Sequence, residues 1–362
     1  MLRYREIKLA LLDLVSKLRV GDKLPSRIKL CVMLETTRTT LDKAIRELID
    51  EGVLEATKGS GTRLVGMIEG TKREADNWCV IVPDATEQIY ILLMKGIEKV
   101  AQRNNINTIV CSSHNDGEKQ EQYIKRLMVS GISGFIIVPI VSYDAQESFR
   151  LYENLLRSKI PFVFCNRGVE GVDAPVVKSS DFYGGLIATR HLIAQGYQNI
   201  AYVCEHKYST SMERCQGYIS ALLEKGIDVN RRFILIPPIK KQLDCYASIR
   251  RLLASEPRPD AIFCFNDHIA ALAAKAIQDA GLRLSDDVGV IGYDNTDVCT
   301  ESKPLLSSVS YKVSKIGEMA ALLLQKAAQG IRPSSNFNYY LFQPDIVTRE
   351  SCLGPVPAQR QE

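Results

Sequence analysis

The chain has few of the residues that bind metals or staple small domains together. Its 362 residues include only four histidines, and its ten cysteines are scattered from Cys31 to Cys352 without a Cys-x-x-Cys pair. Zinc sites and disulfide frameworks both depend on closely spaced ligands or cysteines. We therefore predict no metal site and interpret the cysteines as reduced, mostly buried thiols.

Long apolar runs are also missing near the N-terminus. The segment from Met1 to Leu18 mixes Arg3, Glu6 and Lys8 into its apolar residues, unlike a signal peptide or a membrane-spanning helix. We therefore expect a cytoplasmic protein without a membrane partner. A transport binding protein is disfavoured because it would need an export signal.

No strong imbalance of charge is present either. Hydrophobic residues make up 46% and charged residues 24% of the chain, which is typical of a soluble globular protein, and the length predicts two or three domains. The formal net charge is +4, and residues 1–70 hold 13 Lys and Arg against 10 Asp and Glu. This excess of three suits a polyanionic partner, although many solvated surfaces carry as much.

The first 50 residues have the pattern of three helices. Apolar residues recur at three- and four-residue steps from Ile7 to Leu18, which predicts an amphipathic first helix. Ser26 is placed to cap a second helix, and Thr36 or Thr37 to cap a third. Gly52 is expected to end the third helix.

Two short runs, 53–56 and 62–65, flank a glycine-rich turn and predict a β-hairpin that completes a winged helix-turn-helix. Three motifs here resemble the DNA-binding domain of the GntR family, in order and without gaps. They are Gly-Asp-Lys-Leu-Pro-Ser at 21–26, Thr-Arg-Thr-Thr at 37–40 and Lys-Gly-Ser-Gly-Thr at 58–62. The resemblance implies a DNA-binding domain over residues 1–65, and a charged, glycine-containing linker follows at 66–76.

The GntR resemblance implies that the third helix enters the major groove by its N-terminus and that the turn of the hairpin lies at the minor groove. Hydroxyl groups bind phosphate oxygens, arginine binds a guanine edge, and glycines let the backbone approach the duplex. The residues expected to contact a double-stranded DNA operator are Arg27, Lys29, Thr37, Arg38, Thr39, Thr40, Lys43, Lys58, Gly59, Ser60, Gly61 and Thr62.

The start of the second helix departs from the family. After Pro25-Ser26 the family usually has Glu-Arg-Glu-Leu, whereas this chain has Arg27-Ile28-Lys29-Leu30. The arginine is thus displaced by one position, which is about 100° around a helix axis. Arg27 or Lys29 is the candidate replacement, and we expect this head to read its operator differently from close relatives.

The rest of the chain alternates short apolar runs with helix-length amphipathic segments. The runs lie at 79–82, 108–111, 135–138, 162–165, 200–203, 233–236, 261–265 and 288–291. This alternation predicts an α/β fold with parallel sheets covered by helices on both faces. No Gly-x-Gly-x-x-Gly motif or P-loop follows any of these runs, so we expect no nucleotide cofactor, and none of another kind.

Six motifs of this region resemble, in order, the effector-binding domain of the LacI/GalR regulators, which is itself similar to periplasmic sugar-binding proteins. They lie at 81–84 with 96–98, 160–167, 181–185 with 191–193, 214–218, 265–267 and 290–295. The resemblance implies a two-lobed, type I periplasmic-binding-protein-like body over residues 77–350, followed by a tail at 351–362. Lobe 1 is expected at about 77–179 and 309–335, and lobe 2 at about 180–308 and 336–350.

The LacI/GalR resemblance places an effector in the cleft between the lobes. The residues that it implies are Tyr90, Arg167, Asp181, Arg214, Asn266 and Asp294. They suit the hydroxyl groups of a monosaccharide, because carboxylates accept hydrogen bonds, an amide both donates and accepts them, and arginine presents a planar fork of donors. Each has a structural alternative: Asp181 can cap a helix, and Asn266 and Asp294 can belong to turns.

The combination of a GntR-like head with a LacI-like body resembles the arabinose-repressor group of chimeric regulators. It implies a homodimeric repressor of a carbohydrate-utilisation operon, released from DNA by a monosaccharide such as L-arabinose, with no catalytic residue and no enzymatic activity. One alternative keeps the regulator but takes a purine or a phosphorylated protein co-repressor as effector. Another, from a different class, is a GntR-like head fused to a pyridoxal-phosphate aminotransferase.

Overall fold

The chain forms two compact units, Met1–Ala75 and Asp76–Glu362, which we call the head and the body. The computed structural model describes residues 3–15, 18, 21–57, 61–65, 76–141, 145–239, 241–330 and 338–354. Lys58, Gly59 and Ser60, residues 66–75 of the predicted linker and residues 355–362 of the predicted tail lie outside the described residues. The predicted bounds of both segments are wrong at one end: Asp76 already begins a strand, and Ser351 and Cys352 are buried in a 3₁₀ turn where Ser351 Oγ donates to the carbonyl oxygen of Val290.

The head is a winged helix. Its elements are α1 (Arg3–Val15), α2 (Arg27–Met33), α3 (Arg38–Asp50), β1 (Leu54–Thr57) and β2 (Gly61–Leu64). The two strands pair antiparallel, with Leu54 opposite Leu64. Leu11, Leu30 and Leu41 are fully buried together in one core, so each helix contributes the apolar side that its sequence spacing predicts.

The helix boundaries of the head follow from side-chain caps. Ser26 Oγ accepts a hydrogen bond from Lys29 N at 3.4 Å, and Thr37 Oγ1 accepts one from Thr40 N at 3.4 Å. Of the two threonines considered, Thr37 is therefore the N-cap of α3. Gly52 adopts a φ of 71° just after α3, a conformation that favours glycine.

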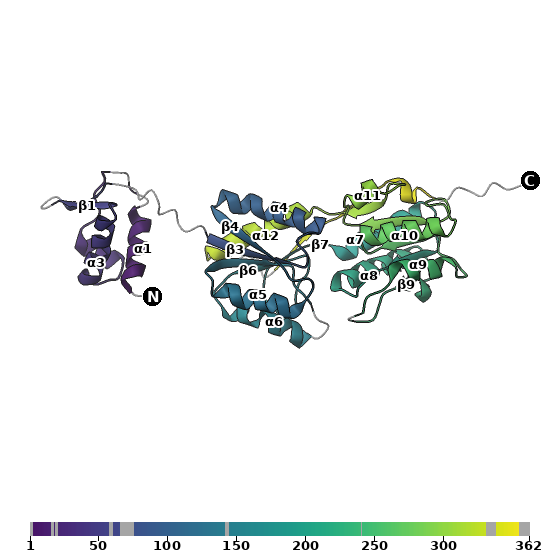
Figure 1. Cartoon of the computed structure of the whole chain (residues 1–362), viewed down its shortest axis with the longest axis horizontal. Helices are drawn as coiled ribbons and strands as arrows, with labels where there is room; N and C mark the ends of the chain where they lie inside the picture. The colour runs from purple at the N-terminus through teal and green to yellow at the C-terminus, as the bar shows by residue number, and fades with distance from the viewer. Residues whose placement is uncertain are drawn as a thin grey trace, which may run out of the picture. The chain divides into compact units, whose positions relative to one another are not determined.

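Lobe 1 of the body is built on a six-stranded parallel sheet in the order β13-β7-β6-β5-β3-β4. Its strands are β3 (Asp76–Val82), β4 (Ile106–Ser112), β5 (Ile132–Ile137), β6 (Phe162–Cys165), β7 (Val176–Ser179) and β13 (Tyr339–Phe342). Helices α4 (Gln88–Arg103) and α12 (Val313–Ala328) lie on one face, and α5 (Gly117–Met128) and α6 (Ala145–Arg157) on the other (Figure 1).

Residues of β3 alternate between the two faces of this sheet, as a strand requires. Val80 and Val82 belong to the cluster that includes residues of α4 and α12, whereas Cys79 and Ile81 belong to the cluster that includes residues of α5 and α6. All four side chains are buried. A strand covered on both faces needs apolar residues at every position, which explains the uninterrupted apolar run in the sequence.

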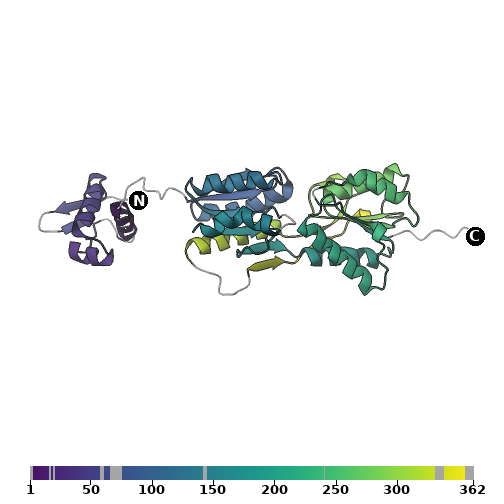
Figure 2. The same ribbon diagram turned by 90° about the horizontal axis from the view of Figure 1, so that it is seen from below.

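Lobe 2 repeats the plan with a sheet in the order β14-β12-β11-β10-β8-β9. Its strands are β8 (Ile200–Val203), β9 (Ile234–Leu235), β10 (Ala261–Cys264), β11 (Gly289–Tyr293), β12 (Ser307–Ser310) and β14 (Asp345–Val347), with only β14 antiparallel to its neighbour. Helices cover both faces (Figure 2). They are α7 (Asp181–Ala194) and α8 (Ser209–Glu224) on one face and α9 (Cys245–Leu253) and α10 (Asp267–Asp279) on the other, with a short α11 (Val298–Glu301) after β11.

The structure corrects the expected division of the lobes near the C-terminus. The prediction returned the chain to lobe 2 at residue 336, but β13 pairs with β7 of lobe 1, with Tyr339 opposite Val176. The chain enters lobe 2 again only after Phe342, to form β14. Ser310 ends β12 and therefore belongs to the sheet of lobe 2, so this part of lobe 2 ends two residues later than the expected residue 308. The chain thus crosses between the lobes after β7, after β12 and after β13.

The run 233–236 is also not the four-residue strand that the apolar pattern indicates. Arg231–Phe233 forms a turn of 3₁₀ helix, and only Ile234 and Leu235 form β9. All ten cysteines are free, and nine of them are buried. Among the described helices, none has the length and apolar character needed to cross a membrane.

Candidate DNA interface and effector site

The first turn of α3 presents exposed hydroxyl groups and a cation. Thr37, Arg38, Thr39 and Lys43 are exposed, and the Arg38 side chain retains 78% of its accessible surface. Thr37 Oγ1 lies 2.9 Å from Thr40 Oγ1, so the hydroxyls form a small cluster at the helix N-terminus. This arrangement can bind phosphate oxygens through hydroxyls and N–H groups and a guanine edge through the guanidinium.

Arg27 is held within the head. Its Nε donates to Asp42 Oδ1 at 2.9 Å, and an Nη donates to Thr62 Oγ1 at 2.8 Å. The contact joins the first turn of α2 to α3 and to the wing strand β2. Thr62 is buried, so its side chain does not lie on the surface expected of a DNA contact, whereas Lys29 and Gly61 are exposed.

A cavity of about 250 Å³ lies between the two lobes of the body. The six residues that the sequence singled out, from Tyr90 to Asp294, all line it. Further lining residues that the sequence did not single out include Glu87, Asn115, Asn166, Glu205, His206, Tyr208, Phe265 and Tyr311. The volume is near the lower end of the range of roughly 300–1,000 Å³ for ligand pockets, so it suits a small molecule.

Arg214 occupies the centre of the polar wall. Its Nε donates to Asp181 Oδ1 at 2.9 Å, one Nη donates to the carbonyl oxygen of Phe265, and its guanidinium lies 3.4 Å from the ring centre of Tyr293. Both Arg214 and Asp181 are almost fully buried. The sequence suggests that Arg214 begins a helix, but α8 begins at Ser209 and Arg214 lies in its second turn.

Two glycines let α7 and α8 approach closely enough to place Arg214. A Cβ atom at Gly185 would lie 2.1 Å from the carbonyl oxygen of Arg214, and one at Gly217 would lie 2.1 Å from that of Phe182. Neither distance is compatible with a side chain. The two glycines therefore permit the short distance between α7 and α8 that places Arg214 at the cavity.

The Asp181 side chain forms ion pairs, and the N-cap position of α7 belongs to Ser180. Ser180 is the N-cap of α7 and Asp181 its first residue, and the Asp181 carboxylate contacts Arg214 and also Lys178 Nζ at 3.4 Å. Lys178 in turn contacts Glu213 at 2.8 Å. A buried carboxylate with two cationic neighbours has its charge compensated before any ligand arrives.

Asp294 faces the same guanidinium at a longer distance. Its Oδ1 lies 3.8 Å from an Nη of Arg214, and 11% of its side chain is exposed. Burial raises the pKa of this carboxyl group to about 7, while Arg214 acts in the opposite direction and the carboxylates of Asp267 and Asp181 add to the rise. Near neutral pH the group can therefore accept a hydrogen bond as a carboxylate or donate one as an acid.

Two amide side chains complete the polar lining. Asn266 is the N-cap of α10, where its Oδ1 accepts from Ile269 N at 2.9 Å, so its NH₂ group remains for a ligand. Asn166 has a φ of 62°, and its buried Oδ1 has no hydrogen-bond partner within the part of the chain that the structure describes. A ligand hydroxyl donating to Asn166 would satisfy that oxygen.

Aromatic rings line the apolar parts of the cavity. Tyr208 and Phe265 lie 6.3 Å apart between ring centres, and the guanidinium of Arg167 is 4.6 Å from the ring centre of Tyr208. Phe265 directly precedes Asn266, so the sequence offered a signal for it, whereas Tyr208 lies in a loop without a periodic pattern. Tyr293 is fully buried against the guanidinium of Arg214 and does not line the cavity.

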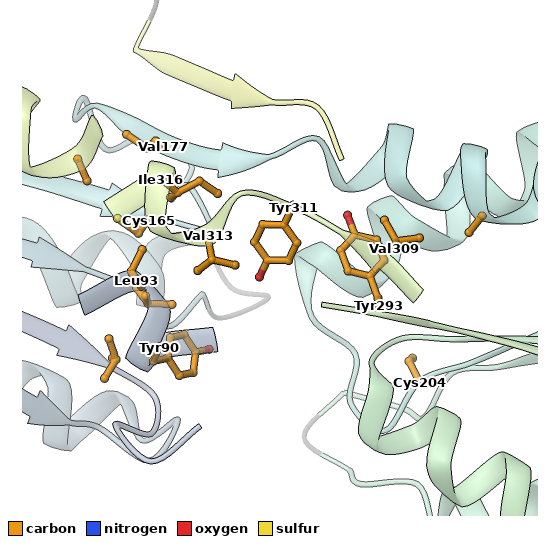
Figure 3. Close-up of a cluster of buried hydrophobic side chains, with 14 of the residues drawn as sticks. Tyr90, Leu93, Cys165, Val177, Cys204, Tyr293, Val309, Tyr311, Val313 and Ile316 are labelled. Carbon is orange, nitrogen blue, oxygen red and sulfur yellow. The ribbon is translucent and has the colours of Figure 1, made fainter. Parts of the chain in front are cut away.

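A continuous apolar cluster connects the lobes beside the cavity. Tyr311 lies between Tyr293 of lobe 2 and the Val313–Ile316 segment of lobe 1 (Figure 3). The rings of Tyr293 and Tyr311 are 5.8 Å apart. On the rim, the Asp297 backbone N–H of lobe 2 donates to Gln88 Oε1 of lobe 1 at 2.7 Å. The lobes therefore have direct contacts that can change when they move.

Comparison with known families identifies both units. Residues 3–64 match the family model described as "Bacterial regulatory proteins, gntR family", and residues 189–352 match "Periplasmic binding protein-like domain". The first match covers the head and the second covers most of lobe 2, including Arg214, Asn266 and Asp294.

Individual relatives cover nearly the whole chain. The arabinose metabolism transcriptional repressor of Geobacillus stearothermophilus is 24% identical over 96% of this chain and 97% of its own. The HTH-type transcriptional repressor PurR of Mannheimia succiniciproducens is 30% identical over 88% of this chain and 90% of its own. A solved LacI family transcriptional regulator from Enterococcus faecium, with bound ribose, is 28% identical, covers 78% of this chain and 100% of its own, and has a TM-score of 0.65.

Proposed function

The chain belongs to the bacterial transcriptional repressors that join a helix-turn-helix DNA-binding head, here of the GntR type, to a periplasmic-binding-protein-like effector body; from this premise we propose that a monosaccharide in the cleft releases it from DNA. The gene targets are those of a carbohydrate-utilisation operon, and L-arabinose or a similar pentose is the effector. The homologues are transcriptional regulators, which disfavours an aminotransferase.

The observation that carries the effector proposal is the mixture of donors and acceptors in the cavity. Arg167, Arg214 and the amide of Asn266 supply donors, and Asp181 and Asp294 supply acceptors. Adjacent sugar hydroxyls need both kinds of partner. Carboxylates in the lining disfavour an anion, while Tyr208 and Phe265 can cover the apolar C–H face of a sugar ring.

The relatives support a sugar without determining which one. The Geobacillus relative is named for arabinose metabolism, and the Enterococcus structure contains ribose. A purine is the second candidate, because several relatives are named PurR and two aromatic rings in the lining suit a planar base. Both candidates use the same cavity.

A thermal-shift screen of the full-length chain distinguishes these effectors. L-arabinose, other aldopentoses, hexoses and purine bases are added separately, because a ligand that binds the folded state raises its stability by RT ln(1 + [L]/Kd). We expect a pentose at about 100 times its Kd to add about 2.7 kcal/mol to the free energy of unfolding. Stabilisation by purine bases alone would contradict the sugar proposal and favour the second candidate.

On the DNA side, we propose that Thr37, Arg38, Thr39, Thr40, Lys43 and Lys29 contact the operator. Arg38 is the cation of the first turn of α3, and its side chain is largely exposed. Its Nε lies 3.8 Å from Asp42 Oδ2, so this ion pair orients the guanidinium only weakly. Gly61 directly precedes Thr62, which Arg27 connects to Asp42 of α3. Sugar binding and DNA binding thus use separate units of the chain.

A further inference from the structure

The outer side of α2 carries an apolar stripe. Ile28, Val32 and Met33 retain 76%, 75% and 52% of their accessible surface, although the opposite side of the same helix packs Leu30 into the core. Ile28 and Val32 are four residues apart and so lie on one side of the helix, about one turn from each other. Side chains of this size gain free energy when another surface covers them.

The first turn of α2 is fixed beside the DNA-facing elements. Arg27, which directly precedes Ile28, donates to Asp42 of α3 and to Thr62 of the wing. Asp42 lies one turn from Arg38, with which it also pairs. Ile28 therefore follows a residue that is bonded both to the recognition helix and to the wing, whereas Val32 lies about 6 Å further along the axis.

The chemistry of Ile28 restricts what it can recognise. A butyl side chain donates and accepts no hydrogen bonds, so it gains little from a phosphate or from the polar edge of guanine, adenine or cytosine. The major groove presents one apolar group on a base edge, the C5-methyl of thymine. We propose that Ile28 contacts a thymine methyl group in each operator half-site and selects a T·A pair there.

The proposal commits this surface to DNA instead of a protein partner. Ile28 follows Arg27, whose bond to Asp42 ties the start of α2 to the first turns of α3, and this end of α3 must approach the duplex to enter the groove. Coverage by DNA would also remove the exposed methyl groups from water. Val32 serves as a control because it has the same exposure on the same helix, one turn away from the Arg27 anchor.

The test removes the methyl group from DNA and the side chain from the protein, separately and together. An operator is selected from a random duplex library with the full-length chain, and each thymine of one half-site is then replaced by uracil. Burial of one methyl group corresponds to roughly fourfold in affinity. We expect one or two replacements to weaken binding of the wild type by that factor, and the same replacements to have no effect on Ile28→Ala.

Val32→Ala is expected to keep the wild-type response to uracil, and Ile28→Arg to change the preferred pair at that position from T·A to G·C. Circular dichroism melting of each variant checks that its head remains folded. The proposal is overturned if Ile28→Ala loses as much affinity as the wild type at every uracil replacement. It is also overturned if Ile28→Ala weakens binding to the thymine and uracil duplexes equally, which would indicate that the stripe contacts protein.

Discussion

At the scale of single residues, Arg214 determines how much of the cavity is preorganised. One guanidinium contacts Asp181, the carbonyl oxygen of Phe265 and the face of Tyr293, and Asp294 lies 3.8 Å away. Lysine cannot replace a planar fork that serves several partners. Asp181 also contacts Lys178, whereas the cationic partner of Asp294 is the more distant Arg214, and burial raises the pKa of Asp294 to about 7.

Replacement of Asp294 by Asn is predicted to remove a pH dependence of stability. The folded state keeps the Asp294 proton up to a pKa of about 7, whereas an unfolded Asp loses it near pH 4. The contribution is therefore fully present below pH 4 and is lost as pH rises through 7. Between pH 6 and pH 8 the wild type is expected to lose roughly 1–2 kcal/mol relative to Asp294→Asn.

Urea unfolding of both proteins across this pH range measures the difference. Asp286→Asn, on an exposed turn where Asp286 pairs with Arg283, is a suitable control because its removal leaves the cavity unchanged. Parallel stability curves for the wild type and Asp294→Asn would contradict the raised pKa.

At the scale of elements, helix N-termini connect the fold to the site. Asn266 follows β10 by two residues and is the N-cap of α10, so one side chain both caps a helix and lines the cavity. Asp181 occupies the first position of α7, and Thr37 caps α3, the helix that we propose contacts DNA. In the body, polar residues that follow parallel strands thus fix helix starts and line the proposed effector site.

Two replacements of Asn266 are predicted to separate these roles. Ser keeps a side-chain oxygen for Ile269 N–H but lacks the amide that faces the cavity, whereas Ala loses both. Asn266→Ser is expected to unfold like the wild type and to lose the stabilisation by sugar, while Asn266→Ala also loses about 1 kcal/mol. Chemical unfolding with and without L-arabinose measures both. A wild-type response to sugar in Asn266→Ser would contradict a direct contact.

The same elements indicate what the sequence can predict. Strands buried on both faces, such as β6 and most of β3, have continuous apolar runs, so they were predictable. The starts of α2 and α3 were predictable as well, because Ser26 and Thr37 cap them. β12 consists of three serines and a valine whose burial depends on hydrogen bonds such as that from Ser308 to Asp267, and no apolar pattern signals it. β13 is partly exposed at the edge of its sheet, and its pairing with β7 is a long-range contact that local pattern does not encode.

The candidate site was predictable where residues follow strands within a motif, as with Asn266 and Asp294. The place of Tyr208 in the site was not predictable, because it depends on the loop between β8 and α8 and on the contact of Tyr208 with Arg167 across the cleft. Arg27 was predicted to face DNA, and its bonds to Asp42 and Thr62 depend on how α2, α3 and the wing pack.

At the scale of the whole molecule, we propose that two copies pair through the edge of lobe 1. β4 is the last strand of its sheet and exposes Ile109 and Val110. Val110 and the exposed Ile91 of α4 line a common groove. An edge strand with exposed apolar side chains is a surface that proteins normally cover. Two copies would bring two heads to two operator half-sites.

Val110→Lys is predicted to convert the dimer to a monomer, which sedimentation velocity measures directly. Val129→Lys is the control, because Val129 is 86% exposed at the end of α5 and does not line this groove. We expect the control to remain dimeric and Val110→Lys to lose affinity for a two-site operator. A dimeric Val110→Lys would exclude this edge as the interface.

The coupling between cleft and head is tested most directly by the fluorescence anisotropy of a labelled operator. The full-length chain is titrated onto the duplex with and without L-arabinose and, separately, other pentoses. Allosteric coupling of roughly 1–3 kcal/mol corresponds to a 5- to 150-fold change in affinity. We predict that a pentose weakens operator binding within this range in the wild type and leaves Asn266→Ser unaffected. Unchanged or tighter operator binding at saturating concentrations of every pentose would contradict release by a sugar.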